Sequence, residues 1–180
     1  MLAIKVAYNN KCAKDIDNVF SAQGNPMFEF FNEDEPKELK KAWKYKGEAG
    51  ARQVPFIGVY EDNRLIKAFY NEDKSYTKLF DWLEEYIDKH AFKGWLTVTK
   101  QEGNNNNLIP VNAVRSGYTK AFMEGVGLYI SGPDDWFHTS VVTSIDWENK
   151  TFKTLNSTYS FVINEKEESK HQQEDSQDSQ

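Results

Sequence analysis

The residue best suited to covalent chemistry is Cys12, the one cysteine in a chain of 180 residues. It stands between a strand-like run and a predicted helix over residues 13–23. A thiol at a helix N-terminus faces unpaired backbone N–H groups and the positive end of the helix dipole, and both favour the thiolate. Lys11 and Lys14 add positive charge, whereas Asp15 opposes a second negative charge. Such a thiol can form mixed disulfides with glutathione or a protein; the alternative is that Cys12 only packs.

A single cysteine also excludes several kinds of site. It rules out an intramolecular disulfide and a multi-cysteine metal centre. The three histidines, His90, His138 and His171, lie far apart in the sequence. A metal site needs three or four converging ligands, so we expect no metal. The sequence contains no glycine-rich phosphate loop and no nucleophile elbow.

Residues 1–90 alternate strand-like and helix-like segments. A proline at position 36 suits the first turn of a helix, and the Asp62-Asn63 turn predicts an antiparallel hairpin. Parallel strands require helical crossovers between them, so the expected order is β-α-β-α-β-β-α. The predicted strands are 2–8, 27–31, 54–60 and 65–70, and the predicted helices are 13–23, one from Pro36 to about Gly47, and one after Ser75.

This order and two local sequences resemble the thioredoxin and glutaredoxin superfamily. Lys11-Cys12-Ala13-Lys14-Asp15 looks like the family's Trp-Cys-x-x-Cys-Lys site, with Asp15 in place of the second cysteine. The run from Ala51 to Pro55 looks like the loop that ends in the family's cis-proline. The resemblance implies an α/β fold, a cis Val54–Pro55 peptide bond, and a site in which Lys11, Asp15, Val54 and Pro55 surround Cys12.

The chain departs from the family at two positions, because the second cysteine is missing and Lys11 replaces the tryptophan. A dithiol–disulfide cycle cannot run within one such chain. We therefore expect a non-catalytic interaction or structural protein that binds a protein partner and needs no cofactor. The alternative is an enzyme, a monothiol glutaredoxin-like thiol–disulfide oxidoreductase that uses Cys12 and glutathione. The composition also resembles uncharacterised bacteriophage proteins, which implies an accessory or assembly role in the host cytoplasm or the virion.

Residues 91–165 predict a small all-β domain, SH3-like or a rolled sheet, of about five short strands. These include 95–98, an edge strand within 108–114, 126–130, 139–147 and 151–163. The segment is rich in large aromatic residues, which we expect in its core; the alternative is an exposed patch for a partner. They are Trp95, Tyr118, Tyr129, Trp136, Trp147 and Tyr159.

The net charge is −6, and the lysines and arginines do not cluster into a basic stripe. We therefore expect no nucleic-acid partner. Half of the net charge falls in residues 166–180, which contain no apolar residue and predict a disordered acidic tail. No run approaches the roughly 20 apolar residues that span a bilayer, so we expect no membrane partner and a cytoplasmic location. The predicted organisation is a thioredoxin-like domain at 1–90, a β domain at 91–165 and the tail at 166–180.

Overall fold

A computed structural model describes residues 2–20, 25, 27–70, 76–103, 109–133 and 136–164. The contacts within the chain divide it into two units, Met1–His90 and Ala91–Gln180. The residues predicted to form the acidic tail lie outside the described part, as do Ser75 and the four consecutive asparagines. Within the described residues, no helix is long and apolar enough to cross a membrane.

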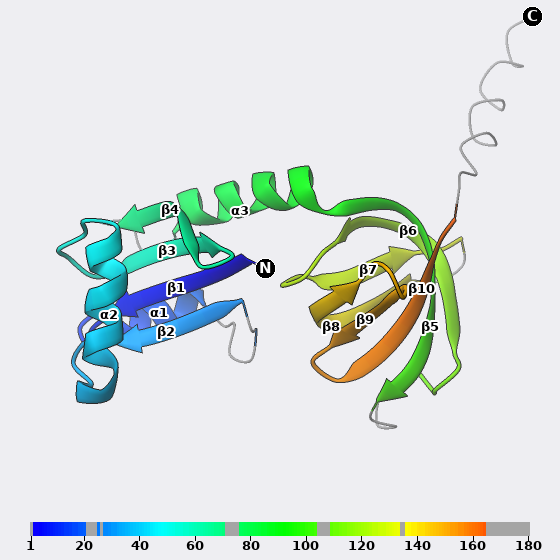
Figure 1. Ribbon diagram of the computed structural model, residues 1–180, viewed down its shortest axis with the longest axis horizontal. Helices are drawn as coiled ribbons and strands as arrows, with labels where there is room; N and C mark the ends of the chain where they lie inside the picture. The colour runs from blue at the N-terminus through cyan, green and yellow to red at the C-terminus, as the bar shows by residue number, and fades with distance from the viewer. Residues whose placement is uncertain are drawn as a thin grey trace, which may run out of the picture. The chain divides into compact units, whose positions relative to one another are not determined.

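The predicted fold class, an α/β protein with a thioredoxin-like domain followed by a small SH3-like β domain, is wrong. Strands hold 51% of the described residues and helices only 23%. The protein is mostly β and combines a mixed four-stranded sheet with a closed six-stranded barrel (Figure 1). The prediction failed because it read residues 91–165 as about five short strands. The described residues of this unit instead form six strands, and two of these are 12 and 11 residues long.

The first unit contains a sheet in the order β2-β1-β3-β4. Strands β1 and β2 are parallel, whereas β1 with β3 and β3 with β4 are antiparallel. Asp62 and Asn63 both have positive φ in the β3–β4 turn, as a tight hairpin requires. The elements are β1 (Leu2–Tyr8), α1 (Ala13–Val19), β2 (Phe28–Asn32), α2 (Pro36–Glu48), β3 (Phe56–Glu61), β4 (Arg64–Tyr70) and α3 (Thr77–His90).

Helices cover both faces of this sheet, because side chains along each strand alternate between the faces. On one face, Ile4 and Val6 of β1 join a buried cluster with Ile16 of α1 and Leu79 of α3. On the other face, Ala7 of β1 packs with the residues of α2 and with Phe31 and Phe56. The sheet is therefore an internal layer, and Figure 1 shows α2 lying across it.

A buried cation lies beneath α2. The side chain of Lys5 donates a hydrogen bond to Tyr45 Oη at 2.9 Å and lies 3.4 Å from a Glu29 carboxylate oxygen. Burial alone would lower the pKa of Lys5, but these two partners outweigh it and raise the pKa. Gly58 is the cross-strand partner of Lys5. A Cβ added at Gly58 would lie 2.7 Å from a ring atom of Tyr60, so the aromatic packing here requires glycine.

The second unit is a barrel whose strands follow one another round the circumference, from β5 to β10, with β10 pairing back onto β5. Every strand pair is antiparallel. The strands are β5 (Phe92–Gly103), β6 (Val114–Phe122), β7 (Gly127–Ser131), β8 (Trp136–Asp146), β9 (Thr151–Thr154) and β10 (Ser157–Asn164).

The barrel interior is filled by apolar side chains from all six strands, among them Leu96, Phe122 and Phe161. Lys100 of β5 is also buried in the barrel, with only 1% of its surface exposed. Its ammonium group donates a hydrogen bond to the Ile109 carbonyl oxygen at 2.9 Å. Gly117 lets the backbone of β6 lie close to the backbone at the start of the β7–β8 turn, because a Cβ at this position would clash with it. The small barrel therefore has a packed core, as expected for a barrel of few strands.

Two strand predictions in this unit were wrong. Strand β6 was missed, and in place of the edge strand expected within 108–114 the described residues 109–114 form a turn followed by the first residue of β6. Residues 151–163 were read as one strand, but a bend at Leu155 and Asn156 divides them into β9 and β10. That bend lets β10 reverse direction and close the barrel onto β5.

Candidate functional site

The structure places Cys12 immediately before α1, at its N-cap position. Its sulfur has three polar contacts at 3.4 Å, all with Asn9: it accepts from the backbone N–H and donates to the backbone carbonyl or the side-chain carbonyl. The Asn9 side chain also accepts hydrogen bonds from the N–H groups of Lys11 and Cys12. Asn9 therefore supplies the hydrogen-bond partners of the thiol and fixes the loop that precedes α1.

The other predicted site residues fall into two groups. Lys11 is exposed and Asp15 lies in the first turn of α1, so both are neighbours of Cys12 along the chain. The Val54–Pro55 peptide bond is cis, which confirms that prediction. Val54 packs against the cluster beneath α2. Among the described residues, no hydrogen bond or ion pair joins Val54 or Pro55 to Cys12.

The chemistry open to this N-terminal site is that of one half-buried thiol. Burial, followed by the negative charges of Glu38 and Asp17, raises the pKa of Tyr8, which lies just before the Cys12 loop. Tyr8 therefore keeps its proton at neutral pH. Within the described residues there is no group of three His, Cys, Asp or Glu side chains that could hold a metal ion.

A second candidate site lies on the outside of the barrel, across β6, β7 and β8. Tyr118 is paired with Ser131 and Ser131 with Trp136, and Tyr129 is paired with His138. Cross-strand partners point to the same side of a sheet, so the aromatic members form one surface. We call Tyr118, Tyr129, Trp136 and His138 the aromatic face.

Three of the four rings of the aromatic face pack against one another although they are exposed. Tyr129 and Trp136 are stacked, with ring centroids 6.0 Å apart and ring planes 16° apart. The rings of His138 and Trp136 pack edge to face, with centroids 5.3 Å apart and ring planes 80° apart. Trp136 is 59% exposed and Tyr129 50%. The stacking holds large apolar surfaces in fixed positions and leaves half of their area in water.

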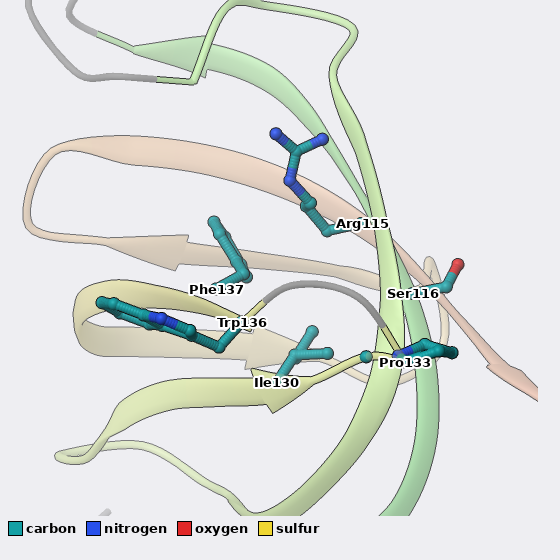
Figure 2. A pocket seen from close by; sticks show the side chains of 7 residues that line it. Arg115, Ser116, Ile130, Pro133, Trp136 and Phe137 are labelled. Atoms are coloured by element: carbon teal, nitrogen blue, oxygen red, sulfur yellow. The ribbon is translucent and has the colours of Figure 1, made fainter.

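A pocket of about 160 Å³ opens beside Trp136 (Figure 2). Its apolar lining comes from Ile130, Phe137 and Pro133, with Trp136 at its side. Arg115 of β6 is its one charged lining residue among the described residues. The pocket thus combines an apolar surface with one cation, next to the aromatic face.

Sequence reasoning expected the large aromatic residues of this unit in its core, and this was wrong for four of them. Tyr159 is buried and Trp95 is half-buried. The exposed four are Tyr118, Tyr129, Trp136 and Trp147. Arg115 was missed altogether, because its place at the pocket depends on how β6 packs beside β7 and β8. The chain matches no protein-family model, and a search of curated proteins gives no match.

Proposed function

We propose that the protein is a non-catalytic interaction protein that binds a partner protein through the aromatic face of its barrel. The observation that carries this proposal is the stacked Tyr129–Trp136 pair on the outer surface. Tyrosine and tryptophan are the residues most enriched at the energetic centres of protein interfaces, where they bury large area with few rotatable bonds. Here the stacking already holds the two rings in place, so binding would lose little additional side-chain entropy.

The charge of the barrel supports a protein partner over a nucleic acid. Residues 91–164 contain six Lys or Arg and six Asp or Glu. A phosphate backbone is bound mainly through an excess of cations, and this unit has none. An interface centred on aromatic side chains and one arginine instead has the composition of a protein–protein interface.

The competing function, monothiol redox chemistry at Cys12, makes a different prediction. It requires the sulfur to leave its contacts with Asn9 and form a mixed disulfide with glutathione or a partner. Any complex that it forms would be lost in Cys12→Ser and released by a reductant. Binding through the aromatic face would be unaffected by the Cys12→Ser substitution and by the reductant.

The test is partner capture with the immobilised full chain from an extract of its native cells. The double variant Tyr129→Ala/Trp136→Ala should lose the captured partner. The matched control is Trp43→Ala, which removes an equally exposed tryptophan from α2 in the other unit. Capture that survives the double variant refutes the aromatic face as the binding surface, and capture that disappears in Cys12→Ser supports redox chemistry instead.

A further inference from the structure

We propose that the pocket beside Trp136 binds one apolar group that carries a carboxylate, such as the last side chain and C-terminus of a partner chain. This inference rests on the proposed function, since the pocket adjoins the aromatic face. It goes further by naming the chemistry that the site would recognise. Three features carry it: the size of the pocket, the position of Arg115, and the fixed orientation of Trp136.

The size of the pocket selects a single side chain. Its volume of about 160 Å³ is close to that of the roughly 150 Å³ apolar cavity that accepts benzene. Ile130 and Phe137 are 1% and 4% exposed. Both side chains are packed in the barrel core, so they cannot move aside to enlarge the pocket. One aromatic ring or one branched aliphatic side chain fits this space, whereas a nucleotide or a disaccharide is too large.

Arg115 supplies the charge that an acid would need. The residue is half-buried, and one of its terminal nitrogens donates to the Val114 carbonyl oxygen at 2.9 Å. Among the described residues, no carboxylate lies within ion-pair distance of it. A guanidinium presents five N–H groups in a planar fork that matches a carboxylate. Its remaining donors can therefore bind an acid at the edge of the pocket.

The other polar side chain that lines the pocket, Ser116, already has a hydrogen-bond partner outside it. The hydroxyl of Ser116 forms a 2.7 Å hydrogen bond with Thr97 Oγ1 on β5, and Figure 2 shows it pointing away from the pocket. Trp136 is held from outside by its stacking on Tyr129. The pocket thus offers a preformed apolar wall and a single cation, which suits an apolar acid better than a polar neutral ligand.

The experiment titrates the full chain, labelled with ¹⁵N, with matched acid and amide probes. The probes are 3-phenylpropionate and 3-phenylpropionamide, and the peptide acetyl-Gly-Gly-Phe with a free or an amidated C-terminus. The readout is the chemical shift of the Trp136 indole N–H. Since a hydrogen bond to a charged group contributes about 1.5–3 kcal/mol, each acid should bind about 10- to 100-fold more tightly than its amide.

Arg115→Gln should abolish this preference, and Arg115→Lys should leave part of it, because lysine keeps the charge without the planar fork. The control is Lys120→Gln, which removes an exposed cation from the same strand and should leave the preference intact. A peptide acid that binds at least tenfold more tightly than phenylpropionate identifies a chain terminus as the ligand, and equal binding identifies a free acid; both support the pocket.

Equal binding of acid and amide by the unmodified protein overturns the inference, whatever the variants do. So does an acid preference that survives in Arg115→Gln. If partner capture still depends on Tyr129 and Trp136 when the acid preference is absent, the proposed function stands and only the pocket's ligand is wrong. If both are absent, the aromatic face has no binding role.

Discussion

The close packing around Gly58 makes a sharp test of the first unit. In Gly58→Ala the new methyl carbon would lie 2.7 Å from Tyr60 and 3.1 Å from Phe56, both ring atoms. Carbon atoms pack best at about 3.5–4.0 Å. Both rings are almost fully buried, and the Tyr60 hydroxyl is held by a 3.0 Å hydrogen bond to Glu48. The rings therefore cannot swing aside without losing packing or this bond.

Overpacking of this kind costs about 1–3 kcal/mol of the free energy of unfolding. For a unit of this size each kcal/mol lowers the melting temperature by about 4–8 °C, so we expect a fall of at least about 4 °C. The measurement is thermal unfolding followed by near-ultraviolet circular dichroism, with urea unfolding to give the free energy.

Gly47→Ala is the matched control, because it makes the same chemical change within α2, where nothing lies within 4 Å of the added carbon. Alanine in a helix is more stable than glycine by about 0.5–1 kcal/mol, so this variant should gain stability. A Gly58→Ala protein as stable as the parent would refute the packing described beneath α2.

Three further predictions concern other parts of the molecule. Gly117→Ala should push β6 away from the β7–β8 turn and speed amide hydrogen exchange in the barrel, with the first unit unchanged, as mass spectrometry would show. Burial, followed by the hydrogen bond to Glu61, raises the pKa of Tyr86 to about 12. Folded Tyr86 keeps its proton where the unfolded chain loses it, so its stabilisation is complete below about pH 10 and is lost as pH rises towards 12. Urea unfolding between pH 9 and 12 should show a smaller loss in Tyr86→Phe, and an equal loss would contradict this linkage. Cys12→Ser keeps a hydrogen-bonding group beside Asn9, so its free energy of unfolding should change by less than about 1 kcal/mol, and a larger change would give the sulfur a structural role.

Local sequence signals predicted the helices and strands of the first unit, because residues near their ends indicate where an element starts or where the chain turns. Pro36 opened a helix, Asp62 and Asn63 marked a hairpin, and each of these appears where it was expected. The barrel was harder to predict. Strand β6 carries charged or small polar residues and Gly117 at most of its positions and so lacks the apolar alternation that marks a strand, although it pairs with β5 and β7, its neighbours in the sequence.

The aromatic face could have been found by following the alternation more strictly. In β7, Leu128 and Ile130 point inward, so Tyr129 between them must point outward. In β8, buried Phe137 likewise places Trp136 and His138 outside. Arg115 carried no such signal, since only the packing of β6 beside β7 and β8 brings it next to residues of those strands. For Cys12, the sequence identified the helix start but not the contacts that Asn9 makes with the thiol.

Closure of the barrel also determines where its chain enters and leaves. Asn164 near the exit is paired with Trp95 near the entry, and paired strands are about 4.8 Å apart. A short Gly-Ser connection could therefore join residues 164 and 92, with new ends cut at the Leu155–Asn156 bend. Such a circular permutant would keep all six strand pairings, and the same proximity would let the barrel be inserted as a cassette into a surface loop of another protein.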